Sequence, residues 1–169
     1  SFASAVSDKA QVRDALLSFA MRAAQKARQE AQVAGAVHIF MQTDRHRAGT
    51  AQKSVSASAT FPRPTSDSRA VVEDVMRLFD QIWCEGYGWR KAGVLLLDLG
   101  APKTVQPSLF DAPSPPRDGL MAAMDQLNRT YGRGTLRPAV GGTTQRWAML
   151  CDKRSLRYTT RWDELPVAS

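Results

Sequence analysis

The sequence predicts an α+β domain in which a four-stranded, mainly antiparallel sheet carries two helices on one face. Two observations lead to this prediction. Strand and helix periodicities alternate in the order β-α-β-β-α-β over residues 1–100, and the composition changes to a proline-rich stretch directly after Gly100. Such an order suits a small sheet with both helices packed together. We therefore predict a domain at 1–100, a linker at 101–117 and a C-terminal extension at 118–169.

The first helix is expected over residues 8–31, after a short strand at 1–6. Its apolar residues recur at steps of four, three and four: Val12, Leu16, Phe19 and Ala23. This spacing places them on one face of a helix. Ser7 or Asp8 is expected to cap its first turn, because both side chains accept hydrogen bonds from free backbone amides.

Alternation of period two predicts the next two strands. In GAVHIFMQT, residues 35–43, one face is apolar and the other presents His38, Phe40 and Gln42. In KSVSASATF, residues 53–61, the outer face consists of small hydroxyl side chains: Ser54, Ser56, Ser58 and Thr60. The FPRP sequence ends the second of these strands, because proline cannot donate to a ladder.

A second helix is expected over residues 67–84, with Ser66 or Asp67 as its cap. Its apolar stripe consists of Val71, Val75, Leu78 and Ile82. The WRKAGVLLLDL run that follows predicts a strand buried over most of its length, because its apolar residues are almost continuous. Beyond the linker, a short helix is expected over 118–131 with the stripe Leu120, Met124 and Leu127, followed by irregular structure or short strands.

Composition limits the class of protein. The chain has 169 residues, is 43% hydrophobic and 23% charged, and is therefore of globular type. It contains neither an apolar run of about 20 residues nor the pattern of a signal peptide. Because it starts without an initiator methionine, we expect a fragment of a longer chain. Its two cysteines, Cys84 and Cys151, are far apart, which favours a reducing, cytosolic setting over a disulfide framework or zinc site.

Charge and motifs argue for binding rather than catalysis. Lys and Arg number 23 against 16 Asp and Glu, a net charge of +7, which favours a polyanionic partner. Phosphate-binding loops and the sequence motifs of hydrolases are absent from the sequence. His38 and His46 are eight positions apart without a carboxylate cluster, so we expect no metal site and no catalytic residues.

A phosphate-contacting surface is predicted around the hydroxyl-lined strand. Small hydroxyls let backbone amides approach phosphate oxygens closely, while cations at the rim neutralise charge. The candidate DNA-contacting residues are Arg45, Arg47, Lys53, Ser54, Ser56, Ser58, Arg90 and Lys91. Few aromatic side chains accompany them, which argues against a single-strand stacking platform. The alternative is an ordinary solvated face.

The linker holds a candidate docking peptide, QPSLFD at positions 106–111. An adjacent leucine and phenylalanine in a proline-flanked tether are suited to a hydrophobic groove, and the glutamine amide fixes the orientation of the peptide. The alternative is that Leu109 and Phe110 cover an edge of the domain's own core.

Taken together, these features resemble the C-terminal region of Y-family, error-prone DNA polymerases of the UmuC type. The resemblance rests on several short matches spread over nearly the whole chain: SF at Ser1–Phe2, DSR at Asp67–Arg69, IWCEGYGWRKAGVLL at Ile82–Leu96, QPSLFD in the linker, and YTTRWDELP at Tyr158–Pro166.

The resemblance implies that residues 1–100 form a little-finger domain, which in this family grips primer-template duplex by its phosphates. It implies that Gln106, Ser108, Leu109 and Phe110 bind the bacterial sliding clamp. The metal-binding carboxylates that transfer the nucleotide belong to the palm domain, so no cofactor is expected in this chain and Mg²⁺ is expected outside it. UmuD-like subunits, a recombinase filament, the nucleoid and the SOS response to DNA damage are further expectations from the family.

Three other functions stay open on the residues alone. A protein-interaction module would leave the basic face idle and show no salt-dependent affinity for DNA. A small RNA-binding domain shares the topology but should carry aromatic side chains on its central strands, where only Phe40 qualifies. A complete small enzyme lacks any catalytic constellation.

Overall fold

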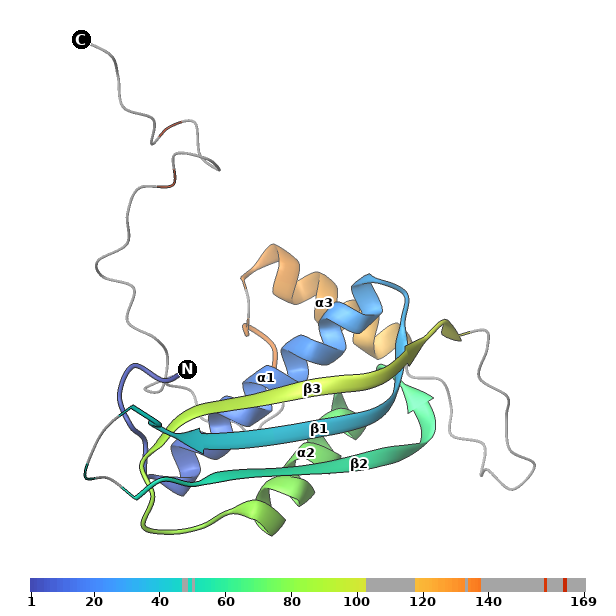
Figure 1. The fold of residues 1–169 in the computed structure, drawn as a ribbon. Helices are drawn as coiled ribbons and strands as arrows, with labels where there is room; N and C mark the ends of the chain where they lie inside the picture. Colours follow the sequence, from blue (N-terminus) through green and yellow to red (C-terminus); the bar gives the residue numbers. More distant parts are fainter. Residues whose placement is uncertain are drawn as a thin grey trace.

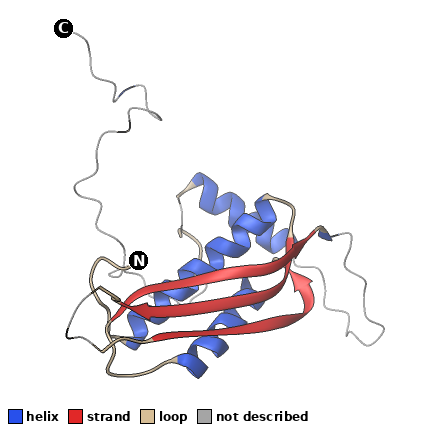
Figure 2. Cartoon of the chain, in the orientation of Figure 1, coloured by secondary structure: helices blue, strands red, loops and turns tan. Residues whose placement is uncertain are grey.

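An antiparallel sheet with two helices on one of its faces forms the core of the chain (Figure 1). The computed structural model describes residues 1–46, 49, 51–102, 118–132, 134–137, 157 and 163. Helices α1 (Lys9–Gln29) and α2 (Ser68–Ile82) lie behind the sheet in Figure 2. The predicted α+β class is confirmed.

The sheet has three strands in the described ranges, in the order β2-β1-β3. They are β1 (Val33–Thr43), β2 (Ser54–Thr65) and β3 (Trp89–Gly100), and both pairings are antiparallel. The prediction of a fourth strand at residues 1–6 is wrong. That segment makes one isolated bridge, between Val6 and Trp89, and the Phe2 amide donates to the Arg90 carbonyl at 2.9 Å. The chain bends at Ala3 and Ser4 between these contacts, so a continuous ladder does not form.

Both long helices begin at the aspartates that the sequence offered as caps. The Asp8 carboxylate accepts from the Ala10 amide at 2.9 Å, and the Asp67 carboxylate accepts from the Arg69 amide at 2.8 Å. Each aspartate thereby satisfies an amide that has no partner within its helix. The two helices start and end within two residues of the predicted bounds.

The core lies between the sheet and the two helices. On the central strand, Val37, Ile39 and Met41 are fully buried, and apolar residues of both neighbouring strands pack beside them. The helices contribute their predicted stripes, including Leu16 and Val75. Full burial of one such side chain favours folding by about 1.5–3 kcal/mol, so this layer supplies most of the driving force.

Strand β3 is buried on one side only, which corrects the prediction of burial over most of its length. Leu95, Leu97 and Leu99 are 43%, 40% and 50% exposed. Strand β3 is an edge strand of a sheet with helices on a single face, so alternate residues point away from the core. The continuous apolar run of β3 therefore corresponds to a strand that is covered on one face only.

Helix α3 (Asp118–Thr130) packs on the same body through an ion pair. Arg28, near the end of α1, donates from Nε and Nη2 to the two carboxylate oxygens of Asp125, each at 2.8 Å. The Arg28 Nη1 atom also donates to the Ser68 hydroxyl at 2.9 Å. Both charged side chains of the pair are only 13% exposed. Arg28 thus joins α1, α3 and the start of α2.

The side of α3 that carries Asp125 is also its buried side. Met121 and Met124 are 4% and 8% exposed, whereas Leu120 and Leu127 of the predicted stripe are 53% and 41% exposed. Residues four apart share a helix face, so Met121 is carried inward with Asp125. The predicted stripe is therefore right only for Met124. Among the described residues, no helix is long and apolar enough to span a membrane.

Candidate nucleic-acid interface

The face of the sheet opposite α1 and α2 is the candidate interface, and we call it the open face. Side chains from the three strands form four rows across it: Ser54–Gln42–Lys91, Ser56–Phe40–Gly93, Ser58–His38–Leu95 and Thr60–Ala36–Leu97. The first row lies at the end where the chain turns from β1 to β2. Polarity falls along the strands from that end toward the leucines of β3.

None of these four rows contains a carboxylate. The nearest acidic residue along β1 is Asp44, past the end of the strand, where it accepts from the His46 amide at 3.0 Å. Exposed acidic side chains such as Glu73 and Asp80 belong to α2, on the other side of the sheet. A polyanion approaching the open face thus meets no opposing charge in these rows.

The hydroxyl strand is arranged as its alternation predicted. Ser54, Ser56 and Ser58 are exposed, and the intervening Val55 and Ala57 pack against the core. Because the exposed side chains are small, a flat or convex partner can come close to the β2 backbone. The hydroxyls can donate hydrogen bonds to phosphate oxygens, which position a nucleic acid without reading its sequence.

Phe40 lies across the neighbouring strand. A Cβ atom placed on Gly93 would overlap the Phe40 ring, so the ring covers the position of the missing side chain. An aromatic side chain opposite a strand glycine supplies the packing that glycine lacks. One side of the Phe40 ring is therefore occupied by the sheet itself.

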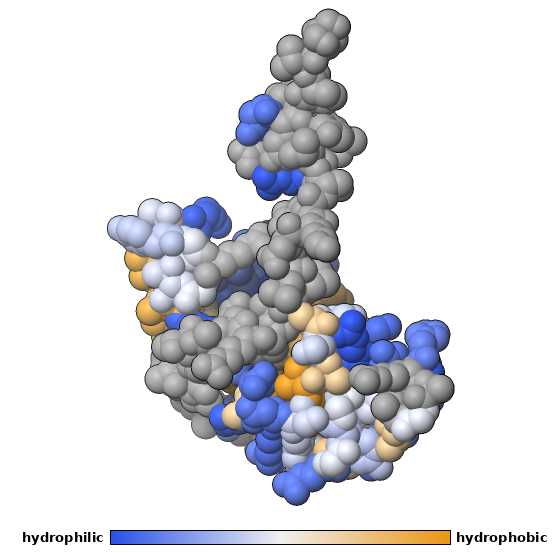
Figure 3. All heavy atoms as spheres, turned by 90° about the vertical axis from the view of Figure 1, so that its left-hand side faces the viewer, coloured by the Kyte–Doolittle hydropathy of each residue, from blue (hydrophilic) through white to orange (hydrophobic). Residues whose placement is uncertain are grey.

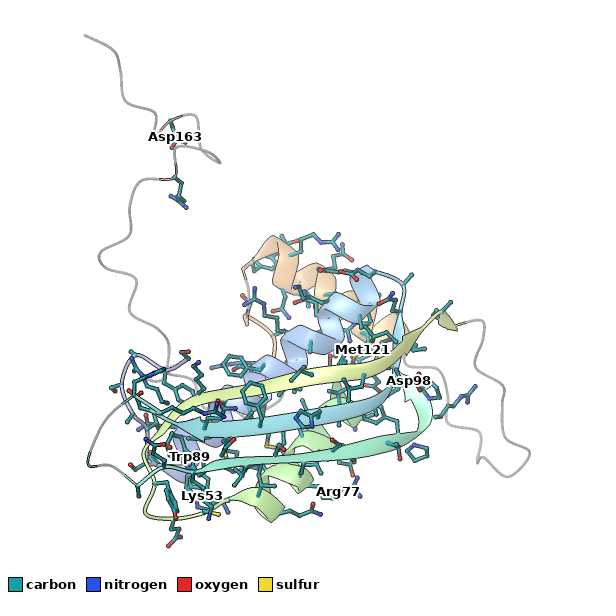
Figure 4. The ribbon with its side chains drawn as sticks, viewed as in Figure 1. Lys53, Arg77, Trp89, Asp98, Met121 and Asp163 are labelled. Atoms are coloured by element: carbon teal, nitrogen blue, oxygen red, sulfur yellow. The ribbon has the colours of Figure 1, made fainter. Side chains whose placement is uncertain are left out.

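Lys53 departs from the open face. Its backbone amide donates to the Thr43 hydroxyl at 2.9 Å, and its ammonium lies 4.8 Å from the centre of the Tyr87 ring. A hydrogen bond with the Cys84 thiol raises the pKa of Lys53, against the opposing effect of desolvation. Figure 4 shows Lys53 at the same end of the sheet as Trp89. Lys53 thus contributes a cation at this end, turned toward the helix side.

The other predicted cations differ in how available they are. Arg90 is half-buried and donates from Nη1 to the Phe2 carbonyl at 2.6 Å, so it holds the N-terminal segment. Lys91 is exposed on the open face, and Arg45 is exposed in the turn after β1. Figure 3 looks onto this end, where hydrophilic and intermediate side chains make up much of the visible described surface. Arg47 lies outside the described residues, as do Gln106, Ser108, Leu109 and Phe110.

The structure therefore brings together Ser54, Ser56, Ser58 and Lys91 from the predicted set, and adds His38 and Gln42 between them. The sequence placed His38 and Gln42 on the polar face of their strand but did not indicate that this face continues the serine face. Only the register of β1 against β2 shows that the two polar faces are continuous. In the sequence, the alternation of polar and apolar residues in both strands was the one feature that pointed to such a face.

Comparison with known proteins agrees with this architecture. Residues 1–109 match the model of the impB/mucB/samB family C-terminal domain. The chain belongs to the impB/mucB/samB family. Residues 118–168 match a second model, a domain of unknown function (DUF4113), which begins at α3. The predicted resemblance to a UmuC-type C-terminal region is confirmed.

Individual members of the impB/mucB/samB family align over nearly the whole chain. Protein UmuC of Salmonella typhimurium (strain LT2) is 38% identical over 168 residues, which is 98% of this chain and 40% of the relative. Protein ImpB of Salmonella typhimurium is 35% identical over 170 residues, and protein MucB of Escherichia coli is 33% identical over 171. The alignments cover 99% and 100% of this chain and 40% of each relative. The chain thus spans about 40% of the length of these curated relatives.

Proposed function

We propose that this chain is the non-catalytic C-terminal part of an error-prone translesion DNA polymerase, and that its open face grips primer-template duplex through the phosphates. Catalysis, and the Mg²⁺ that it needs, would belong to the part of the polymerase outside this chain. The setting would be the tolerance of DNA damage at the bacterial nucleoid. Membership of the impB/mucB/samB family supports the first element of the proposal.

The observation that carries the DNA proposal is the open face, whose four rows hold serines, a threonine, an imidazole and Lys91 but no carboxylate. Phosphate contacts require donors and cations free of competing acidic groups. Exposed Lys91 and Arg45 supply cations at one end, and the β2 hydroxyls supply donors along one edge. Contacts of this kind position a duplex without specifying its sequence, which suits a polymerase that must act anywhere.

The linker adds the second element of the proposal. We propose that Gln106, Ser108, Leu109 and Phe110 dock in the groove of a sliding clamp, with the apolar pair as anchor. A tether to the clamp raises the local concentration of the polymerase at the primer end, even if its own grip on duplex is weak. UmuD-like subunits and a recombinase filament are proposed as further partners from the family resemblance.

Salt dependence tests the phosphate grip. We would measure binding of the chain to a fluorescent primer-template duplex by anisotropy between about 50 and about 200 mM salt. If Lys91, Arg45 and one further cation each neutralise a phosphate, a plot of the logarithm of the affinity against the logarithm of the salt concentration should have a slope of about −2.7, at about −0.9 per contact. Affinity that is flat in salt would contradict the grip.

Clamp docking has its own test with a matched control. A Leu109→Ala, Phe110→Ala double variant should lose binding to a bacterial sliding clamp. A Leu120→Ala, Leu127→Ala double variant removes two exposed apolar side chains from α3 and should still bind the clamp. Equal affinity of the linker variant and the unchanged chain would contradict docking through this peptide.

A protein-interaction module without DNA affinity is the second candidate, and the exposed leucines of β3 favour it. Leu95, Leu97 and Leu99 form an apolar row on an edge strand, a feature typical of protein contacts. A Leu95→Ser, Leu97→Ser variant separates the candidates. It should leave salt-dependent DNA binding intact if phosphates are gripped on the β2 side, and should abolish partner binding if the row is the interface.

A further inference from the structure

His38 occupies the middle of the open face and is held in a defined orientation. Its Nδ1 atom lies 2.8 Å from the Ser58 hydroxyl oxygen, and the two residues are direct cross-strand partners on β1 and β2. A ring nitrogen engaged by a neighbour leaves the other nitrogen, Nε2, as the group available to a ligand. The pair forms within the rows that lack carboxylates.

The groups facing His38 leave its charge uncompensated. Across β2 the facing residue is Ser58, and across β3 it is Leu95, neither of which titrates near neutral pH. The cation of the same face, Lys91, is four positions away along β3, about 13 Å at the usual rise of a strand. The Asp98 carboxylate, three positions beyond Leu95, lies against Gly35. The helices, with their acidic side chains, pack on the opposite side of the sheet.

We propose that His38 is a phosphate-contacting residue of the open face, oriented by Ser58, and that binding of duplex DNA takes up a proton at its imidazole. This inference rests on the proposed grip on DNA. It adds a residue at the centre of the surface, between the β2 hydroxyls and Lys91. It also makes the grip sensitive to pH, because an imidazole can change its charge between about pH 5 and about pH 8.

The sign of the pH effect follows from the charges. A phosphate oxygen near Nε2 stabilises the imidazolium over the neutral ring, so the complex holds more protons than the free components. Affinity must then rise as the pH falls. Because the imidazolium becomes one additional cation at the phosphate, the salt slope should become steeper by about 0.9 when the ring is charged.

The experiment is the salt titration of duplex binding, repeated at about pH 7.5 and about pH 5.5. For the unchanged chain we expect affinity to increase several-fold at the lower pH and the salt slope to steepen by about 0.9. His38→Gln keeps a polar side chain that cannot be charged, so it should bind equally at both pH values. His46→Gln is the matched control, because it removes the chain's other imidazole from the adjacent turn, and it should retain the full response.

The proposed role of Ser58 is tested by a measurement that would not change if Ser58 only stabilised the fold. The NMR titration of the His38 ring should shift its midpoint to higher pH when duplex is added. Ser58→Ala should reduce that shift, and Ser58→Thr, which keeps the hydroxyl, should restore it. Circular dichroism confirms that each variant is folded.

Two outcomes would overturn the inference: a response to pH that survives in His38→Gln, or an unchanged chain whose affinity does not vary with pH. Neither contradicts the proposed function, provided that binding at about pH 7.5 still depends on salt. Absence of binding at every salt concentration and both pH values would instead contradict the grip on DNA itself, and the inference with it.

Discussion

The two faces of strand β1 follow one backbone yet have opposite tasks. Ile39 points into the layer under the helices and is fully buried, whereas the preceding residue, His38, points to the open face and bonds to Ser58. The covered face is apolar and provides stability. The four rows of the open face combine small hydroxyls, polar side chains and the leucines of β3 without a carboxylate, and they provide the proposed binding surface. Adjacent residues of β1 point to opposite faces of the sheet, so one stabilises the core and the next belongs to the proposed binding surface.

The largest expected effect tests the covered face. Ile39→Ala should lower the free energy of unfolding by about 2–5 kcal/mol, because it removes buried methyl groups and leaves a cavity. His38→Ala, one position away, should change it by less than about 1 kcal/mol. Urea denaturation of both variants makes the comparison. Equal losses would contradict the assignment of the two faces.

The same contrast should hold on α3. Asp125→Ala leaves the Arg28 guanidinium mostly buried without its carboxylate and should cost about 3 kcal/mol of stability. Leu120→Ala, on the outward side of the same helix, should cost less than about 0.5 kcal/mol. Hydrogen exchange of the α3 amides reports whether the helix is released. Retained protection in the Asp125 variant would mean that the two methionines alone hold the helix.

A charge on the open face should change binding and leave stability nearly unaltered. Ser56→Glu places a carboxylate among the rows that lack one and should weaken duplex binding about tenfold, or about 1.4 kcal/mol. Gln81→Glu adds the same charge on the exposed side of α2 and should change affinity less than about twofold. Anisotropy at low salt measures both. A similar loss of duplex affinity in the two variants would mean that the net charge of the chain, and not the position of the carboxylate, causes the effect.

The smallest effect concerns the packing of the open face itself. Gly93→Ala should push the Phe40 ring aside and cost about 1 kcal/mol, because the added methyl overlaps it. The Gly119→Ala control meets no neighbouring atom and should not destabilise α3, since alanine favours helix. Denaturation curves measure the loss of stability, and the NMR signals of the Phe40 ring show whether the ring has moved. An unmoved ring in the first variant would show that the face tolerates a side chain there.

The sequence correctly predicted the features that depend on near neighbours in the chain. Asp8 and Asp67 were among the expected caps, and the serine alternation of β2 placed its side chains correctly. The predictions failed where a feature depends on distant partners. The leucine run of β3 indicated two covered faces, and the predicted stripe of α3 included Leu120 and Leu127, which are exposed. The sites on the linker are predictions still, because positions 106–110 lie outside the described residues.

By itself, the sequence determined the α+β class, the order of the elements from α1 onward, the caps and the inward or outward parity of β1 and β2. These follow from periodicity and local hydrogen bonding. Only the tertiary structure decided that Ser58 faces His38, that Lys53 turns toward Tyr87 rather than the open face, and that Asp125 meets Arg28. Each of these depends on the register or rotation of one element against another, which is set by long-range pairing and burial rather than by the local pattern.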